Sequence, residues 1–320
     1  MTYLWAIPAI SLSLVGLGQK VDEQAIAPSM TDPATEILDL DEERNQRLTI
    51  PVTIGGAGPY DFMIDTGSQA TAVTHRINDS LALTPLGTAT LVGMASRRPV
   101  DLVEVNDLVV GNFTINDLVA PVLYRNHVGA DGIIGLDSLQ DFRVLIDFRK
   151  ETIALEDVTK KNSRRGFEII VRAKQKLGQL LITNAIVDGV KATVIIDTGA
   201  QASLANTALR DRIRSRHSQE VTTMDVNGVT MTGDLSYVRS LEIEGLKLTN
   251  VPLTFADAPA FEALGLKDEP VLSLGMQHLK MFDRVAIDFS RQRVLFDVPR
   301  DVARAMRRVN HSGYSDSRIR

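Results

Sequence analysis

A seven-residue motif occurs twice in this chain, and each copy places an aspartate at the end of an apolar, strand-like run. The copies are residues 65–71 (Asp-Thr-Gly-Ser-Gln-Ala-Thr) and 197–203 (Asp-Thr-Gly-Ala-Gln-Ala-Ser). Burying an aspartate costs free energy unless a partner or hydrogen bonds compensate for the lost water. Two carboxyl groups on equivalent strand ends can compensate each other by sharing one proton. The motif therefore predicts two similar halves that bring Asp65 and Asp197 together.

The repeat extends over both halves of the chain. Asp65 and Asp197 are 132 residues apart, and the aspartates of two later Asp-Phe pairs, Asp147 and Asp288, are 141 residues apart. Corresponding residues of the two halves keep a nearly constant spacing, except for one insertion of about seven residues near 258–266 in the second half. The sequence thus indicates an internal duplication.

Short apolar runs separated by turn residues dominate both halves, which predicts an all-β fold. Residues 48–54 alternate as a strand, residues 55–59 form a glycine-rich turn, and 60–64 return into the first motif. Residues 180–187 and 190–196 repeat this hairpin before the second motif. A short helix is expected within 72–81 and at the start of the tail at 300–320.

Two hydrophobic residues followed by Asp-Thr-Gly-Ser/Ala resemble the active-site signature of the pepsin and retropepsin clan of aspartic peptidases. With two copies, the chain resembles a bacterial single-chain retropepsin-like aspartic protease over about 49–297. The resemblance implies two homologous retropepsin-like (acid protease) β-barrel lobes with the active site between them. It also implies an aspartic endopeptidase that hydrolyses peptide bonds with an activated water. The alternative is a peptide-binding module that keeps the cleft without catalysis.

The same resemblance assigns roles within the motifs. Asp65 and Asp197 would form the catalytic dyad, one taking a proton from a bound water while the other protonates the scissile carbonyl oxygen. The threonine hydroxyls would lock the two loops together, and the glycines would let the backbones approach. The residues expected to support the dyad are Thr66, Gly67, Ser68, Thr198, Gly199 and Ala200.

The two copies of the motif differ at their fourth position, which is Ser68 in the first copy and Ala200 in the second. In the family a serine here can donate a hydrogen bond to the adjacent carboxylate, and such a bond favours the ionised form. We therefore expect Asp65 to carry the charge more often and Asp197 to carry the proton.

Two further turns are candidates for flaps that close over an extended substrate and exclude water. One contains Gly93 and Met94, and the other contains Asn227 and Gly228, an Asn-Gly pair typical of hairpin turns. These four residues are the expected substrate contacts.

The apolar-Gly segments 133–135 and 272–275 are expected to support the two aspartate loops. The second half departs from the first at two places: Ser273 stands among apolar residues, and Gln277 occupies the position of Asp137. His278 lies beside this segment, where we expect a structural histidine.

Other chemistries have no support in the sequence. The five histidines are scattered without metal-ligand spacing and there is no cysteine. No phosphate-binding loop, dinucleotide fingerprint or Gly-x-Ser-x-Gly elbow is present. A formal net charge of −5 gives no reason to expect nucleic acid as a partner. We therefore expect no cofactor and no metal, and a peptide or protein substrate.

The composition divides the chain into segments. Residues 1–18 are expected to be a signal peptide, or a short membrane anchor if uncleaved, which predicts a periplasmic or secreted protein. The other expected segments are an acidic arm at 19–47, which is alternatively a propeptide, lobe 1 at 48–158, a linker at 159–166, lobe 2 at 167–299 and a basic tail at 300–320. One chain carries both motifs, so we expect a monomer with an internal pseudo-dimer, although pairing of lobes between chains remains an alternative.

Overall fold

The computed structural model describes residues 3–5, 35–39, 41–42, 48–157, 167, 169–213 and 218–299. Apart from 3–5, the expected signal segment lies outside these ranges. The expected linker and basic tail, and all of the acidic arm except 35–39 and 41–42, also lie outside them. Within the described ranges, no helix is long and apolar enough to span a bilayer.

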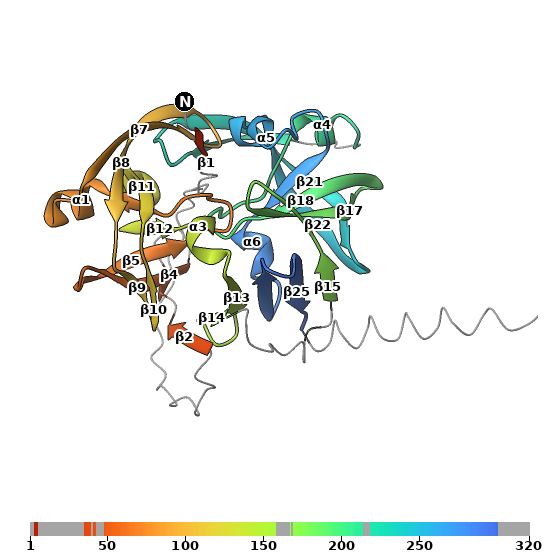
Figure 1. Ribbon diagram of the computed structural model, residues 1–320. Helices are drawn as coiled ribbons and strands as arrows, with labels where there is room; N and C mark the ends of the chain where they lie inside the picture. Colours follow the sequence, from red (N-terminus) through yellow and green to blue (C-terminus); the bar gives the residue numbers. More distant parts are fainter. Residues whose placement is uncertain are drawn as a thin grey trace, which may run out of the picture.

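Three β-sheets make up the structure: one in each lobe and a third below them (Figure 1). This arrangement confirms the all-β prediction, and both lobes follow the same order of strands and turns. The first lobe has the strand order β1-β7-β8-β11-β6-β12-β5-β4-β9-β10, with β3 paired to β4. Its elements are β1 (Tyr3–Trp5), β3 (Asp41–Glu42), β4 (Leu48–Ile54), β5 (Ala57–Ile64), β6 (Ala72–Thr74), α1 (His75–Leu81), β7 (Pro85–Val92), β8 (Arg97–Val105), β9 (Leu108–Val110), β10 (Phe113–Ile115), β11 (Leu118–Leu123), α2 (Arg125–Val128), β12 (Gly132–Ile134) and α3 (Leu136–Leu139).

The second lobe has the strand order β16-β17-β18-β23-β19-β22-β21-β20, and an extra pairing of β17 with β21 closes part of the sheet on itself. The expected insertion forms α5 and the turn after it. The elements of this lobe are β16 (Lys174–Lys176), β17 (Gln179–Val187), β18 (Val190–Ile196), β19 (Leu204–Ala205), α4 (Thr207–Arg210), β20 (Ser218–Met224), β21 (Thr230–Ile243), β22 (Leu246–Phe255), α5 (Pro259–Ala263), β23 (Val271–Leu274) and α6 (Met276–Leu279).

The third sheet was not predicted, and it takes its strands from both halves of the chain. Its order is β15-β25-β24-β13-β14-β2. The last hairpin of each half, β13–β14 or β24–β25, belongs to this shared sheet and not to the sheet of its own lobe. Residues 35–39 of the expected acidic arm form β2, which pairs with β14. The strands are β2 (Thr35–Asp39), β13 (Phe142–Asp147), β14 (Thr152–Asp157), β15 (Ile169–Arg172), β24 (Arg284–Asp288) and β25 (Arg293–Asp297).

The two halves meet where β13 and β24 pair antiparallel. At one end of this seam Arg143 stands opposite Asp288, and at the other Asp147 stands opposite Arg284. All of the apolar side chains of both strands between these ends except Leu145 are buried, so the seam is both hydrogen-bonded and packed.

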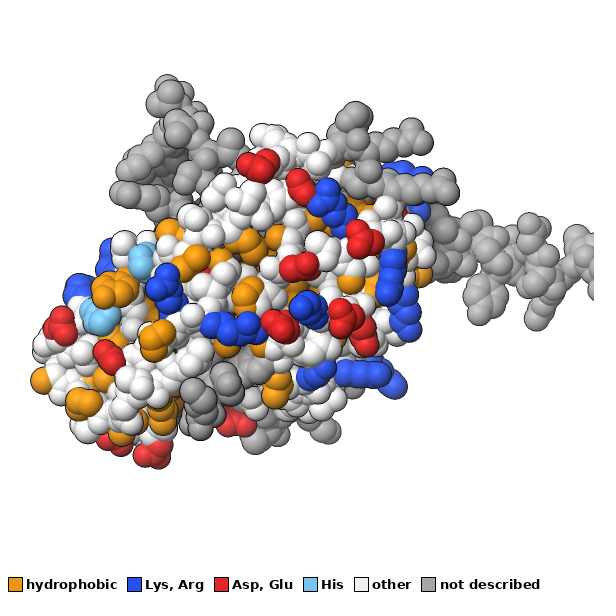
Figure 2. Space-filling view, turned by 90° about the horizontal axis from the view of Figure 1, so that it is seen from above, with side chains coloured by type: hydrophobic (Ala, Val, Ile, Leu, Met, Phe, Trp, Pro, Cys, Tyr) orange, Lys and Arg blue, Asp and Glu red, His pale blue; other side chains and the backbone are white. Residues whose placement is uncertain are grey.

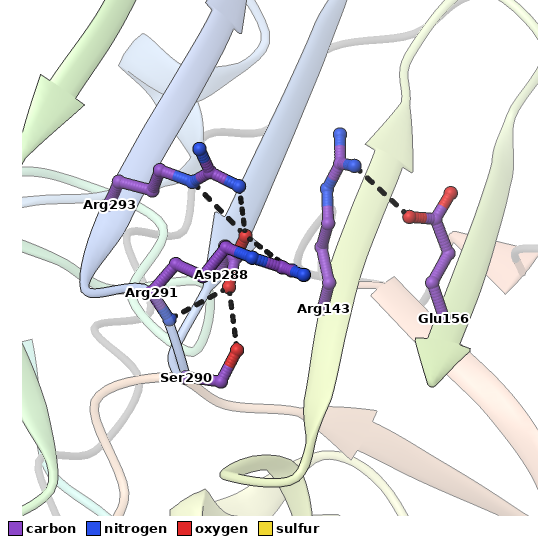
Figure 3. A network of polar contacts seen from close by, with 6 residues as sticks. All are labelled: Arg143, Glu156, Asp288, Ser290, Arg291 and Arg293. Carbon is purple, nitrogen blue, oxygen red and sulfur yellow. Dashed lines mark hydrogen bonds and ion pairs between the residues drawn. The ribbon is translucent and has the colours of Figure 1, made fainter. Parts of the chain in front are cut away.

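Buried charges flank the seam (Figure 3). Asp288 accepts a hydrogen bond from Arg293 Nη2 at 2.8 Å, and Arg143 forms an ion pair with Glu156 at 3.2 Å. Burial alone would raise the pKa of Asp288, but hydrogen bonds from Arg293, the Arg291 backbone and Ser290 bring it below its usual value. The network therefore keeps Asp288 ionised inside the sheet.

Candidate active site

Both motif aspartates lie at the carboxyl end of a buried strand. Asp65 follows β5 and Asp197 follows β18, and neither is exposed to solvent. Each is anchored by its neighbouring parallel strand: the Asp65 amide donates to Ile134 O at 3.0 Å, and the Asp197 amide donates to Leu274 O at 3.1 Å. The segments 133–135 and 272–275 thus support the two loops as expected.

Each loop then turns back to hydrogen-bond its own aspartate. Oδ1 of Asp65 accepts from the amides of Gly67 and Ser68, at 2.8 and 3.0 Å. Oδ1 of Asp197 accepts from the amides two and three residues later, at 3.1 and 3.0 Å. Amide donors stabilise a negative charge and leave the other oxygen of each carboxyl group for other contacts.

The two loops meet at a local two-fold axis. A side chain on Gly67 would collide with the carboxyl group of Asp197, and one on Gly199 would collide with the carboxyl group of Asp65. Glycine is required at both positions because each loop backbone lies against the aspartate of the other lobe. The structure therefore brings together the two carboxyl groups that the sequence paired.

The threonines join the loops across the axis. Thr66 Oγ1 donates to Ile196 O at 2.8 Å, and Thr198 Oγ1 donates to Ile64 O at 2.7 Å. Each hydroxyl also accepts a backbone amide of the opposite threonine, at 3.0 Å for the Thr66 amide and 3.3 Å for the Thr198 amide. Four reciprocal bonds fix the distance between the two strand ends, and with it the geometry of the dyad.

The prediction that the Ser68 hydroxyl donates a hydrogen bond to Asp65 is wrong. Ser68 Oγ donates to Ala70 O at 2.9 Å, and a hydroxyl has only one hydrogen to donate. A hydroxyl does reach the other aspartate, because Ser273 Oγ donates to Asp197 Oδ2 at 2.9 Å. The serine that looked like a departure from the pattern thus contacts the dyad directly.

Beneath the loops the two lobes use different polar networks. In lobe 1, Thr71 Oγ1 lies 2.6 Å from both Asp137 Oδ1 and Ser138 Oγ. In lobe 2, Ser203 Oγ lies 2.7 Å from His278 Nδ1. Burial raises the pKa of Asp137 and lowers the pKa of His278 to about 4. His278 is therefore neutral near pH 7 and acts as a structural residue.

The expected flaps are the tips of the hairpins β7–β8 and β20–β21, and the two tips touch. Asp225 Oδ2 accepts from Ser96 Oγ at 2.7 Å and from the Ala95 amide at 3.2 Å. Asn227 Nδ2 donates to the same serine hydroxyl at 2.9 Å. Gly93 lies so close to Asp225 that a side chain there would collide with its carboxylate. These contacts are named the flap latch below.

Each flap tip also packs into the opposite lobe. Met94 is buried in an apolar cluster of lobe 2 that includes Phe261 of α5, and Val226 is buried in a lobe 1 cluster that includes Leu123. The insertion at 258–266 therefore supplies part of the apolar surface against which the first flap packs. An exposed ion pair between Arg97 and Glu262, at 2.9 Å, joins the same two elements.

A cavity of about 490 Å³ lies beside the latch. Its wall includes β8, β11 and the second flap, with polar and aromatic side chains from both lobes. They include His75, Arg98, Tyr124, His127 and Asn227. A side chain on Gly228 would collide with His127, so the second flap forms one wall of this cavity. The four flap residues expected from the sequence thus lie around the crossing of the two hairpins.

The face that carries β7 and α5 is seen from above in Figure 2. Acidic and basic side chains are interspersed there with hydrophobic ones, so this face has no field of one sign. Across the described ranges, no group of three or more His, Cys, Asp or Glu side chains is placed to hold a metal ion.

Sequence reasoning missed two further contacts of the site. Asp225 and Ser96 have the composition of ordinary turns, and nothing in the sequence relates them. Gln179 is buried at the start of β17, and its Nε2 donates to Gly67 O at 2.8 Å across the two lobes. A polar residue before an apolar run carries no signal of such a contact.

Known proteins resemble this chain to different degrees. The crystal structure of a retropepsin-like aspartic protease from Rickettsia conorii is similar, with 21% sequence identity and a TM-score of 0.30 over 41% of this chain and 88% of that one. No curated protein matches the sequence. The family described as aspartyl protease matches residues 50–138 and 183–277, more than half of the chain, with one Asp-Thr-Gly motif in each segment. The chain therefore belongs to the aspartyl protease family.

Proposed function

We propose that this protein is an aspartic endopeptidase in which Asp65 and Asp197 activate a water for peptide-bond hydrolysis. The observation that carries the proposal is the mutual contact of each motif glycine with the opposite aspartate, together with the reciprocal threonine bonds. Two adjacent carboxyl groups cannot both ionise at low cost, so they share one proton. One is then a base and its neighbour an acid.

The pair performs general acid–base catalysis. The ionised carboxylate takes a proton from the water as its oxygen attacks the scissile carbonyl carbon, while the protonated partner donates to the carbonyl oxygen. Collapse of the tetrahedral intermediate returns one proton to the dyad and delivers the other to the leaving nitrogen. No covalent bond to the enzyme forms.

Substrate binding requires the flap latch to open. In the latched state Met94 and Val226 are buried in the two clusters of the opposite lobes. We expect an extended peptide that enters between the lobes to meet these tips and the latch. We therefore expect hairpin opening to precede binding, and closure to exclude water around the scissile bond.

One chain supplies both aspartates, so the active form proposed is the monomer. The test is incubation of the purified full-length chain with a peptide library from acid to neutral pH, next to Asp65→Asn and Asp197→Asn. Cleavage that is lost in both variants supports the proposal. Binding of peptides without cleavage at any pH supports a peptide-binding module instead. Cleavage that survives in either variant contradicts the proposed dyad.

A further inference from the structure

A serine hydroxyl distinguishes the two aspartates. Ser273 lies in β23, directly beneath the second aspartate loop, and is completely buried. Its Oγ donates to Asp197 Oδ2 at 2.9 Å, whereas the loop amides bind Oδ1 of the same carboxyl group. Asp197 therefore receives hydrogen bonds from its own lobe on both oxygens.

The first lobe has no hydroxyl at the corresponding place. Ser273 pairs in register with Ile195, and the equivalent pair in lobe 1 is Ile133 with Met63. An isoleucine cannot donate a hydrogen bond. The other candidate hydroxyl in that lobe, Ser68, is directed to Ala70 O. In this register lobe 2 therefore places a hydroxyl on its aspartate, whereas lobe 1 has an isoleucine.

We propose that Ser273 is a positioning residue that places the shared proton: Asp197 is the ionised base and Asp65 is the protonated acid. This inference deepens the proposed function and rests on it for its catalytic consequence. The physical reason is that a hydrogen bond donated to a carboxylate stabilises its charged form, and a buried charged acceptor benefits more than a neutral one. It reverses the assignment expected from Ser68.

The reaction follows from this assignment. Asp197 removes a proton from the water, the water oxygen forms a bond to the carbonyl carbon, and Asp65 gives its proton to the carbonyl oxygen. The intermediate is a neutral gem-diol. Asp197 then protonates the nitrogen as the C–N bond breaks, and Asp65 recovers a proton from a gem-diol hydroxyl. The products are an acid and an amine, and the dyad returns to its starting state.

Apart from Asp197 itself, two buried titratable groups of the described residues lie on the elements around this bond. Asp65 is on the opposite loop and is part of the pair. His278 is on α6, next to the support segment, where Ser203 binds its ring. Because His278 also titrates in acid, its contribution has to be separated from that of the dyad.

The first test is the pH dependence of kcat/KM for wild type and Ser273→Ala. Loss of the hydroxyl should raise the lower apparent pKa of the profile by about one unit. Ser68→Ala, the matched change in the other lobe, should leave that pKa in place. Both profiles are repeated in a His278→Asn background, so that this imidazole makes no contribution. An unchanged profile in Ser273→Ala, or a lowered pKa, overturns the inference.

A second test does not depend on turnover. In Asp65→Asn the remaining Asp197 should ionise at lower pH than Asp65 does in Asp197→Asn, measured by NMR of ¹³C-labelled aspartate carboxyl groups. Adding Ser273→Ala should raise the ionisation pH of Asp197 and leave that of Asp65 unchanged. If the wild type fails to cleave any peptide, the proposed function fails while this titration still tests the proton position. If Ser273→Ala leaves the titration of Asp197 unchanged, the inference fails and the function stands.

Discussion

Ser96 in the first flap donates a hydrogen bond to Asp225 in the second flap, with 2.7 Å between Oγ and Oδ2. The two residues come from different halves of the chain and join the tips of the two hairpins. Asp225 is buried, and its Oδ1 binds the amides of Asn227 and Val229 within its own turn. One carboxylate therefore shapes the second flap and holds the first one against it.

Removing the Ser96 hydroxyl should loosen the flaps without disturbing the lobes. Ser96→Ala removes a charge-assisted bond between the tips but leaves the turn around Asp225 intact. Because such a bond stabilises by about 1.4 kcal/mol or more, amide exchange in residues 90–97 and 222–229 should accelerate about tenfold. Hydrogen–deuterium exchange with mass spectrometry measures this. Ser218→Ala, an exposed change at the base of the second hairpin, is the control, and equal exchange in the two variants would contradict the latch.

Loss of one threonine hydroxyl should weaken both the fold and the site. Thr198→Val leaves Ile64 O and the Thr66 amide without the hydroxyl that binds them, and both groups are buried. We expect a loss of about 2–4 kcal/mol in the free energy of unfolding and a lower kcat. Urea denaturation and peptide cleavage give the two values. Thr198→Ser keeps the hydroxyl, so it should stay within about 1 kcal/mol of wild type. A serine variant as unstable as the valine variant would mean that the methyl group matters more than the bonds.

The protein should lose stability in acid because of His278. Its pKa is lowered from 6.5 to about 4 by burial, so the folded state holds a neutral ring where the unfolded state takes up a proton. Stability is therefore full above about pH 6.5 and falls as the pH drops from there towards 4. The loss amounts to about 3 kcal/mol at most.

The check is urea unfolding at pH 7 and pH 4.5 for wild type and His278→Asn. The asparagine keeps a polar group near Ser203 and does not titrate. It should lower stability at pH 7 but flatten the pH dependence over this interval. Equal slopes in the two proteins would show that other groups cause the acid sensitivity.

The buried ion pair beside the seam predicts strong coupling between two side chains. Arg143 is almost completely buried, and burial raises the pKa of Glu156 while Arg143 lowers it. Arg143→Met leaves the glutamate without its partner and should cost about 3 kcal/mol of unfolding free energy. The double variant with Glu156→Gln should recover a large part of this loss, which a double-mutant cycle in urea measures. Additive effects of the two changes would contradict the coupling.

The sequence predicted the fold class and the approach of the two motif loops because both depend on local patterns. Two copies of Asp-Thr-Gly after apolar strands specify the loops, and the alternation of apolar residues specifies the strands. It did not predict the third sheet, because β13 and β24, which pair at its centre, are far apart in the chain. It did not predict the flap latch for the same reason.

The proton assignment shows a second limit. Ser68 stands at the position where a serine can reach the carboxylate, yet its rotamer directs the hydroxyl to a backbone carbonyl. Ser273 was visible in the sequence only as a polar residue in an apolar strand. Which of two serines binds an aspartate depends on side-chain direction within a few ångströms, and residue spacing carries no such information.

The two strands of the β13–β24 seam carry the same pattern of charges, and this pattern is complementary to itself when the strands pair antiparallel. Each strand has an arginine near its start and an aspartate four residues later, and antiparallel pairing sets every arginine opposite an aspartate. Such a palindromic edge suits two separate identical chains as well as two halves of one. Because one chain carries both halves, the halves can differ, and Ser273 and His278 stand where lobe 1 has Ile133 and Ser138. In a symmetric homodimer both sides would carry the same residues.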